Sequence, residues 1–305
     1  MAGETLRDVV ARLNASVTAV AALGAALDAR VGQRPLDPNL RPHIDGVLDA
    51  LGIRDEVENA GVEELRPLLG EIRTFDLTGA KLFSARAAHQ AGWTHLEGDL
   101  LEAAGDVTAG LPRRLRTAIA PKLDGLEARL SSAGAAFLDI GVGVGVLAIE
   151  MARLWPELTV VGIDTWAPAL TMARDRVRAA DLEHRIVLRE QAGEAIEDVE
   201  AFDLAWIPSV FVPERVLPKV MARVHVALRP GGWLLLPMMR AAGEPLQAAI
   251  TRLRVAHFGG SLLTTERAGA LLAEQGFVNV HPLPAPADSN AAMMVAQRPV
   301  TSDRG

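Results

Sequence analysis

Three glycines at alternate positions, Gly141, Gly143 and Gly145, follow a short apolar run that ends with Asp139 and Ile140. Glycine has no Cβ and adopts positive φ without strain, so a ligand can lie directly against the main chain at such positions. An apolar, helix-like run, VLAIEMA, follows the last glycine. The stretch FLDIGVGVGVLAIEMA therefore predicts a strand, a ligand-binding turn and a helix, in that order.

Two classes of nucleotide ligand are compatible with a glycine turn of this kind. The dinucleotide fingerprint is G-x-G-x-x-G, in which the third glycine allows the helix to pack closely on the strand. Here the third glycine, Gly145, comes one position early, and an acidic residue, Asp139, stands inside the end of the strand. A pyrophosphate prefers a helix N-terminus without a nearby negative charge. The spacing thus favours a ligand with a cationic end.

The stretch LDIGVGVGVLA resembles motif I, (D/E)xGxGxG, of the class I S-adenosylmethionine-dependent methyltransferases. The next apolar run, VVGID, ends in Asp164, 23 residues after Gly141. A carboxylate about 20 residues after a glycine turn is the expected partner of a ribose. The segment LRPGGWLLL resembles the turn before the fifth strand of this family, and FVNVHPL with AAMMVAQR resembles its closing antiparallel hairpin. The resemblance covers residues 135 to 298.

Fold and domain organisation follow from this resemblance and from a change in residue composition and spacing along the chain. Residues up to about 132 are rich in alanine and leucine at helical spacing, whereas short β-branched runs alternate with helical stretches from Ala135 onward. We expect a helical cap or dimerisation domain over residues 1–132. Residues 133–305 are expected to form an α/β catalytic domain with a Rossmann-like, seven-stranded, mostly parallel sheet whose last strand is antiparallel.

The resemblance implies S-adenosyl-L-methionine as the cofactor and assigns its contacts residue by residue. Asp139 would lie near the methionine ammonium, and Asp164 would hold the ribose hydroxyls. One of the two residues after Asp164 would pack on the adenine, with the Trp166 ring as a stacking plane or as a core or dimer contact. The remaining expected cofactor contacts are Gly141, Val142 through its backbone, Gly143, Gly145, Thr165, Ile207 and Pro208.

One departure from the family concerns the residue that accepts a hydrogen bond from the adenine amino group. Many members carry an aspartate there, but the matching stretch LREQAGEAI has Ala192 at that place. Gln191, Glu194 or a backbone group could take over this role.

The acceptor side is expected after the fourth strand, where WIPSVFVPE is mostly apolar and lacks the NPPY or DPPY of nucleic-acid amino methylases. We therefore expect a small apolar or aromatic acceptor, methylated by in-line displacement, in which the enzyme mainly aligns the acceptor atom. The chain has no tyrosine, so histidine is the leading type of general base. His257 is the first candidate, and His89 and His95 are alternatives. No carboxylate cluster indicates a metal, so none is expected.

Other activities remain compatible with this pattern. A methyltransferase-fold protein can bind the cofactor and catalyse a non-methylating reaction, such as cyclisation or decarboxylation. A nicotinamide reductase is disfavoured by the displaced third glycine.

The first predicted helix, residues 5 to 31, carries apolar residues in a 4-3-4-3 spacing that starts at Leu6 and Val10. This spacing is typical of a coiled-coil or bundle seam, so the helix either packs within its own domain or joins a homodimer.

The net charge of −7 and pI of about 5.6 do not indicate a nucleic-acid-binding surface. Absence of cysteine, of a visible signal peptide and of a sufficiently long apolar run predicts a cytoplasmic protein without a membrane partner.

Overall fold

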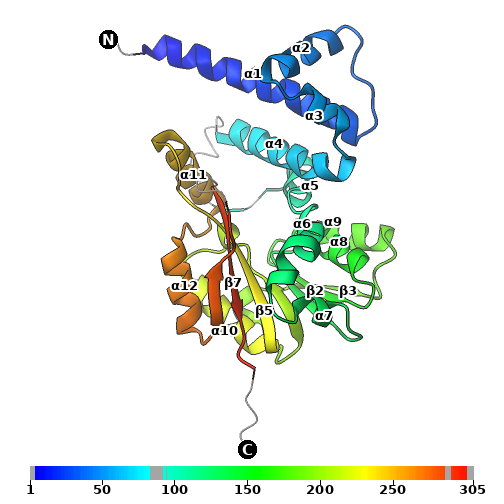
Figure 1. Ribbon diagram of the computed structural model, residues 1–305, viewed down its shortest axis with the longest axis vertical. Coiled ribbons are helices and arrows are strands. Elements are labelled where there is room, and N and C mark those ends of the chain that lie inside the picture. Colours follow the sequence, from blue (N-terminus) through cyan, green and yellow to red (C-terminus); the bar gives the residue numbers. More distant parts are fainter. Residues whose placement is uncertain (1–3, 83–91, 94, 286–289, 301–305) are drawn as a thin grey trace, which may run out of the picture. The chain divides into compact units, whose positions relative to one another are not determined.

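The computed structural model describes residues 4–82, 92–93, 95–285 and 290–300. The chain divides into two compact units (Figure 1). A helical unit comprises Met1–Ser84 and Glu97–Gly110, and a sheet unit comprises Ala85–Leu96 and Leu111–Gly305. The chain therefore enters the sheet unit briefly, returns to the helical unit and then re-enters the sheet unit. The division into a cap and a catalytic domain at residue 132 remains a prediction about function.

The helical unit is built around one long helix, and its core lies at the C-terminal half of that helix. Its elements are α1 (Leu6–Val31), α2 (Arg41–Leu51), α3 (Arg54–Asn59), α4 (Val62–Leu82) and α5 (Gly98–Asp106). A capping box closes the start of α1, because Thr5 accepts from the Asp8 N–H and the Asp8 carboxylate accepts from the Thr5 N–H. The buried core is formed by Ala26, Leu27, Leu48, Val57, Leu65 and Leu69.

The N-terminal half of α1 carries an exposed apolar stripe. The predicted helix is confirmed, and Leu6, Val10, Leu13, Val17 and Val20 are between 46% and 80% exposed. The expectation that the protein has no membrane partner stays a prediction, because a single apolar helix is weak evidence for a membrane span. By length and composition alone, the whole of α1 meets the requirement for crossing a bilayer, although the apolar run inside it is short. A stripe of this kind requires a partner surface or remains a liability in water.

The sheet unit has the predicted seven-stranded sheet, in the order β3-β2-β1-β4-β5-β7-β6. Strands β1 to β5 are parallel, and β7 runs antiparallel between β5 and β6. The strand bounds are Ala136–Ile140 (β1), Thr159–Asp164 (β2), Ile186–Glu190 (β3), Phe202–Trp206 (β4), Leu228–Met239 (β5), Val278–Pro282 (β6) and Ala291–Gln297 (β7). The longer helices are α8 (Val146–Leu154), α9 (Ala167–Ala179), α10 (Leu217–Ala227), α11 (Pro245–Phe258) and α12 (Thr265–Glu274). The fold class expected from the sequence is confirmed.

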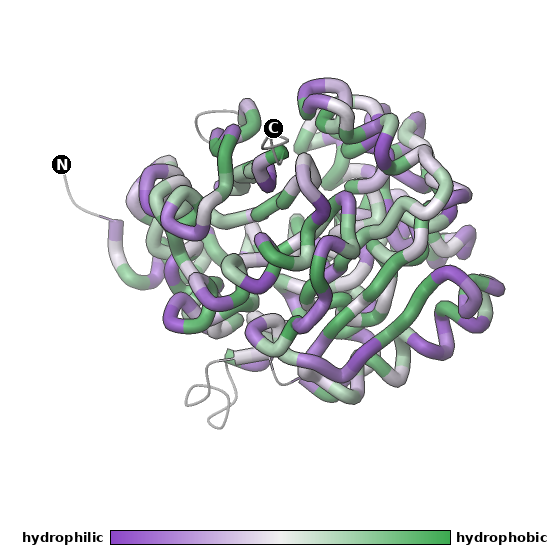
Figure 2. The backbone as a smooth tube through the Cα atoms, turned by 90° about the horizontal axis from the view of Figure 1, so that it is seen from below, coloured by the Kyte–Doolittle hydropathy of each residue, from purple (hydrophilic) through white to green (hydrophobic). Residues whose placement is uncertain are grey.

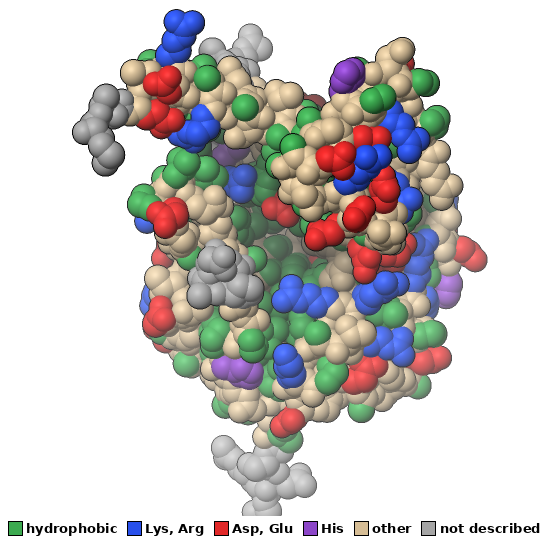
Figure 3. Space-filling model, turned by 45° about the horizontal axis from the view of Figure 1, so that its top comes forward, with side chains coloured by type: hydrophobic (Ala, Val, Ile, Leu, Met, Phe, Trp, Pro, Cys, Tyr) green, Lys and Arg blue, Asp and Glu red, His purple; other side chains and the backbone are tan. Residues whose placement is uncertain are grey.

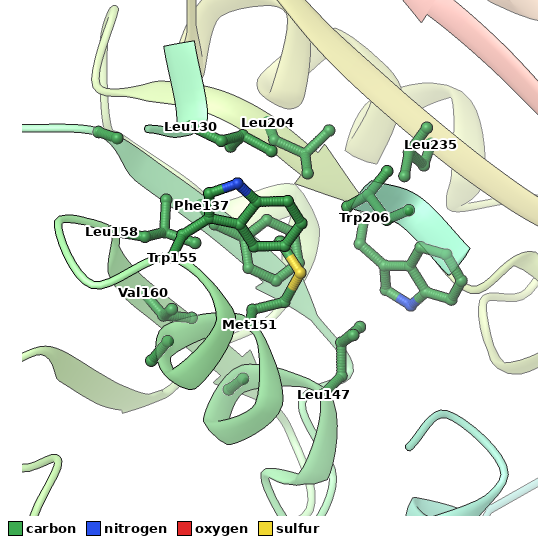
Figure 4. Close-up of a cluster of buried hydrophobic side chains, with 14 of the residues drawn as sticks. Leu130, Phe137, Leu147, Met151, Trp155, Leu158, Val160, Leu204, Trp206 and Leu235 are labelled. Carbon is green, nitrogen blue, oxygen red and sulfur yellow. The ribbon is translucent and has the colours of Figure 1, made fainter. Parts of the chain in front are cut away.

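Apolar side chains alternate between the two faces of the sheet, as a two-residue strand period requires. Along β1, Phe137 joins the core beneath α8 and α9, whereas Leu138 and Ile140 join the core beneath α10 and α12. Figure 4 shows the first core, in which Trp155 and Met151 of the α8 region lie over Phe137. Along the helices, hydrophobic and hydrophilic segments alternate (Figure 2), which is the pattern of one buried and one solvated face.

Helical segments that precede the sheet complete one of these cores. They include α6 (Leu111–Arg114) and α7 (Leu126–Leu130), and their neighbourhood contributes Leu115, Ile119, Leu123, Leu126 and Leu130 to the core with Phe137. Residues 111 to 130, which the sequence analysis grouped with the helical half, thus pack on the sheet.

The segment LRPGG differs from the turn that the sequence predicted before β5. The strand already begins at Leu228, and its register with β4 shifts between Phe202 and Leu204. Gly231 has a φ of +76°, and its N–H donates to the Arg298 carbonyl. The glycine pair therefore forms an irregularity inside a continuous strand, where a left-handed residue is needed.

A buried ion cluster fixes the end of the sheet opposite to the glycine turn. Asp203 is 4% exposed, and its Oδ2 accepts from the Ala136 N–H at 3.1 Å and from Arg229 at 2.5 Å. Its Oδ1 lies 3.4 Å from Arg129 Nη1. Asp203 thus has a structural role.

Replacing Asp203 with asparagine is expected to lower the free energy of unfolding by about 2 kcal/mol, because hydrogen bonds to a charged group lose their charge assistance. Urea denaturation of both proteins measures this. Asp175→Asn, on the exposed surface of α9, serves as the control, since the exposed ion pair between Asp175 and Arg178 contributes little. An unchanged midpoint for Asp203→Asn would show that the cluster contributes nothing net.

Candidate functional site

The glycine turn lies at the carboxyl end of β1, between β2 and β4 in the sheet order. All three glycines adopt left-handed backbone conformations, with φ of +69° at Gly141, +54° at Gly143 and +81° at Gly145. A Cβ at Gly145 would be in ordinary van der Waals contact with Ala173 of α9, 3.4 Å from the Ala173 Cβ. The turn therefore needs glycine for its backbone conformation.

The N–H groups of this turn are largely occupied within the protein. The Gly141 and Val142 N–H groups donate to the Ile163 carbonyl at 2.8 and 3.0 Å, and the Gly145 N–H donates to the Val142 carbonyl at 2.9 Å. The Gly143 N–H donates to Asp164 Oδ2 at 2.9 Å. A phosphate cradle needs such donors free. The turn instead offers a bare main-chain surface and carboxylates. These features suit a ligand with a cationic end, which the sequence also favours.

Asp164, at the end of β2, holds the glycine turn and the start of the next loop together. Its Oδ2 accepts from Gly143, and its Oδ1 accepts from the Trp166 N–H at 2.9 Å. Burial raises the pKa of Asp164, while the backbone donors of Trp166, Gly143 and Thr165 act to lower it. A carboxylate has about four acceptor positions, so this side chain keeps acceptor capacity for the vicinal hydroxyls of a sugar.

Asp139 is the second carboxylate of the site, and it is 2% exposed. It lies opposite Gly162 of β2 and Trp206 of β4 in the sheet register. Its Oδ2 accepts no hydrogen bond from the described residues. Burial, and secondarily the charge of Asp164, raise the pKa of Asp139 well above its usual range. A buried carboxyl in this condition is suited to a cationic or hydrogen-bond-donating ligand group.

The loops after β2 and β3 carry the expected adenine-side residues. Thr165 is exposed and Trp166 is half-buried, and the Trp166 indole N–H donates to the His95 carbonyl at 2.7 Å. The Gln191 N–H donates to the Asp164 carbonyl at 2.9 Å, while its side-chain amide donates to the Ala195 carbonyl at 2.6 Å. Because this bond uses the amide nitrogen of Gln191, the amide oxygen is the atom of that side chain that can accept a hydrogen bond from a ligand. The neighbouring Ala192 is half-buried.

The segment after β4 lies directly beside the glycine turn. Ile207 and Pro208 are buried, and a Cβ at Gly141 would lie 3.3 Å from the Pro208 Cγ. Ser209 anchors the segment through its hydroxyl, which donates to the Pro237 carbonyl at 2.9 Å. The backbone of Ser261 also donates to the Ser209 carbonyl at 2.8 Å. The structure thus brings the expected cofactor side and the expected acceptor side into contact at Pro208.

Two of the candidate histidines lie in an aromatic cluster on the acceptor side. His257, in the last turn of α11, has its ring centroid 6.0 Å from that of His95 and 6.1 Å from that of Phe258. Trp93 contacts His95, Phe211 and Phe258, with ring centroids 4.6, 5.0 and 5.5 Å away. His89 lies outside the described residues. Among the residues described here, no group of three or more histidine and acidic side chains has the arrangement of a metal site.

Three residues that shape this site were missed by the sequence analysis. A Cβ at Gly162 would meet the Val142 side chain at 2.6 Å, and a Cβ at Gly260 would meet the Val210 carbonyl oxygen at 1.8 Å. The lone glycine inside the apolar run VVGID was a readable sign of such a close approach. The third residue, Trp93, carried no readable sign, because its neighbours after β4 and α11 are distant in sequence.

Comparisons with known proteins place the fold of this chain among methyltransferases. Residues 137–232 match the family model described as "Methyltransferase domain". Among solved structures, an O-methyltransferase family protein from Burkholderia thailandensis has a TM-score of 0.59 at 17% identity, covering 99% of this chain and 100% of that one. The S-adenosylmethionine-dependent methyltransferase SibL has a TM-score of 0.59 at 18% identity, covering 95% and 99% of the two chains. The mitomycin 7-O-methyltransferase MmcR has a TM-score of 0.55 at 15% identity, covering 97% and 100%. No curated protein matches the sequence.

Proposed function

We propose that this chain is a class I S-adenosylmethionine-dependent methyltransferase, since residues 137–232 match the methyltransferase domain model, and that it methylates a small apolar or aromatic molecule. The observation that carries the proposal is the pair of carboxylates around a glycine turn whose own N–H groups are largely occupied. The acceptor class is supported by the apolar segment after β4 and by the aromatic cluster next to it. MmcR, a structural neighbour over nearly the whole chain, is a mitomycin 7-O-methyltransferase.

The residues present fit S-adenosylmethionine. The unpartnered Oδ2 of Asp139 suits the ammonium or its water shell, the glycine turn leaves room against the main chain, and Asp164 keeps acceptor positions for the ribose hydroxyls. When bound, this cofactor supplies a methyl group made electrophilic by its sulfonium. The task of the protein is then to align the acceptor atom and exclude water.

We assign His257 the role of general base for an acceptor that must lose a proton. Its place in the last turn of α11 puts it beside the aromatic cluster. We assign Gln191 and the backbone around Ala192 to the adenine side.

Figure 3 shows acidic and basic side chains interspersed on the face that it presents, with hydrophobic side chains between them.

The transfer is tested by incubating the protein with S-adenosylmethionine and a panel of aromatic alcohols and amines. We expect S-adenosylhomocysteine to accumulate with at least one acceptor and not in its absence. His257→Ala tests the base: the proposed role requires a lower kcat for alcohols and a smaller effect for amines, which attack without prior deprotonation. Conversion of an acceptor without S-adenosylhomocysteine would indicate a non-methylating reaction.

Cofactor affinity is expected to rise with pH across the range in which Asp139 loses its proton. The raised pKa of Asp139 means that the unliganded protein holds this proton up to a higher pH than a free carboxyl does. A cationic group favours the ionised form, so binding releases the proton, and acidification weakens binding. Calorimetry in two buffers with different ionisation enthalpies measures the released protons. Asp139→Asn should bind weakly and show no such release, whereas proton uptake by the wild-type protein would contradict the assignment.

We further propose that the exposed stripe of α1, formed by Leu6, Val10, Leu13, Val17 and Val20, packs on a second copy of this chain. The 3.5-residue repeat is the pattern that two helices share when they supercoil around each other. Sedimentation of the full chain should show a dimer. The double variant Val10→Glu, Val17→Glu should be monomeric, while Ala15→Glu, on the opposite side of the helix, should remain dimeric. A wild-type monomer at high concentration would refute the dimer.

A further inference from the structure

A short piece of chain between α4 and α5 lies in the sheet unit, although both helices belong to the helical unit. We call its described residues, Gly92, Trp93, His95 and Leu96, the crossing segment. Two hydrogen bonds hold it on either side of Trp93. The Gly92 N–H donates to the His257 carbonyl at 3.0 Å, and the His95 carbonyl accepts from the Trp166 indole N–H at 2.7 Å.

The sheet topology shows where this segment runs. Trp166 follows β2, and Phe211 follows β4, and these two strands flank β1 in the sheet. The crossing segment contacts Trp166 through His95 and Phe211 through Trp93. Because the carboxyl ends of parallel strands meet at one edge, a segment that touches both loops passes the end of β1. That is where the glycine turn lies, so the crossing segment runs beside the cofactor site.

Trp93 has aromatic neighbours from two different elements. Phe211 belongs to the turn after β4 and Phe258 to the end of α11, and their ring centroids are 5.4 Å apart. The Trp93 ring stands at 69° to Phe211 and at 77° to Phe258, which are edge-to-face arrangements. Phe258 is buried, whereas Phe211 is 39% exposed and Trp93 is half-buried. The cluster therefore presents an aromatic surface and not only a core.

This surface is connected to the cofactor site through the turn after β4. The Phe211 N–H donates to the Pro208 carbonyl at 3.0 Å, and Pro208 lies against Gly141. The turn is anchored on its other side by Ser261, whose hydroxyl donates to the Val212 carbonyl at 2.7 Å. Only the short turn after β4 thus separates a ring that lies on the cluster from the glycine turn.

We propose that Trp93, Phe211 and Phe258 recognise a planar aromatic acceptor, and that the crossing segment holds Trp93 in place for this purpose. The inference rests on the proposed methyltransferase function and narrows its acceptor class from apolar molecules to flat aromatic ones. Aromatic rings pack on one another in offset and edge-to-face geometries that saturated rings do not share. His95 and His257 give the same surface a polar edge, with ring centroids 6.0 Å apart.

The test compares two probes that differ in aromaticity, naphthol and its saturated counterpart decalol. Each is titrated calorimetrically into the full chain saturated with S-adenosylhomocysteine. We expect naphthol to bind roughly 10-fold more tightly, which is the scale of an aromatic pair contribution. Trp93→Leu should lose the preference, and Trp93→Phe should keep most of it. Leu253→Ala, which alters an exposed apolar residue of α11 outside the cluster, should bind both probes like the wild-type protein.

The outcomes separate this inference from the proposed function. If S-adenosylhomocysteine binds and raises Tm in the wild-type protein and the three variants, each of the four is folded. Equal affinities of the wild-type protein for naphthol and decalol would then overturn this inference and leave the proposed function intact. A preference that survives in Trp93→Leu also overturns it. If S-adenosylhomocysteine does not bind, the proposed function fails. The naphthol and decalol titrations of the unliganded protein then still decide whether the cluster prefers a flat ring.

Discussion

Replacing Asp164 with alanine is expected to reduce the affinity for S-adenosylmethionine by about 100-fold or more, since two hydrogen bonds to a charged group contribute roughly 3–6 kcal/mol together. The loss has a second cause. Asp164 accepts the N–H groups of Gly143 and Trp166, so its removal leaves the glycine turn and the following loop without their common anchor. The site then loses both a ligand contact and the element that shapes it.

Calorimetric titration with S-adenosylmethionine measures this effect, with circular dichroism to show that the sheet persists. Asp164→Asn is an informative second variant, because its amide oxygen can still accept one of the two backbone N–H groups. Its affinity should fall between those of the wild-type and alanine proteins. Glu157→Ala is the control, because Glu157 is exposed and lies just before the start of β2, whereas Asp164 lies at its end. Wild-type affinity in Asp164→Ala would remove Asp164 from the cofactor site.

Replacing Gly260 with alanine is expected to destabilise the protein by about 4 kcal/mol or more, the range reached only by severe steric or burial defects. The added Cβ would lie 1.8 Å from the Val210 carbonyl oxygen and 2.7 Å from the Phe211 nitrogen. Both are backbone atoms, so no side-chain rotation can relieve the overlap. The connection after α11 must move away from the turn after β4, which carries Pro208 and Phe211.

Chemical denaturation measures the stability loss. A steady-state assay with the best acceptor from the panel measures the functional consequence, a higher KM for that acceptor. Gly269→Ala provides the matched control in α12, because a Cβ there would have no neighbour closer than 3.7 Å. That variant should be as stable as the wild-type protein or slightly more stable, since alanine favours helix. A Gly260→Ala protein of wild-type stability would mean that the two backbones are not in close contact.

Local sequence patterns, together with the family resemblance, were sufficient to predict the sheet and to place the candidate cofactor site. The alternation of β-branched runs with helical stretches identified each of the seven strands. The resemblance of Asp139, the glycines and Asp164 to the family's motif placed the candidate cofactor site at the ends of β1 and β2. These features are readable because a strand, a turn and a helix are each encoded within a few neighbouring residues.

The occupation of the turn's N–H groups could not be read from the sequence. The Ile163 carbonyl accepts two of these groups, and Asp164 accepts a third, so the result depends on how β2 aligns with β1. The bare surface and the carboxylates remain as the features that suit a cationic nucleoside.

The sequence by itself determined the strands, the glycine turn and its two acidic residues, because these depend on residue types at short, regular spacings, and its resemblance to a known family completed the fold class. Only the tertiary structure decided that Trp93 lies beside Phe211 and Phe258, and that Gly260 lies on the backbone of Val210. These contacts join segments that are from about 50 to more than 160 residues apart. Their geometry follows from how the strands and helices pack, and no local pattern records it.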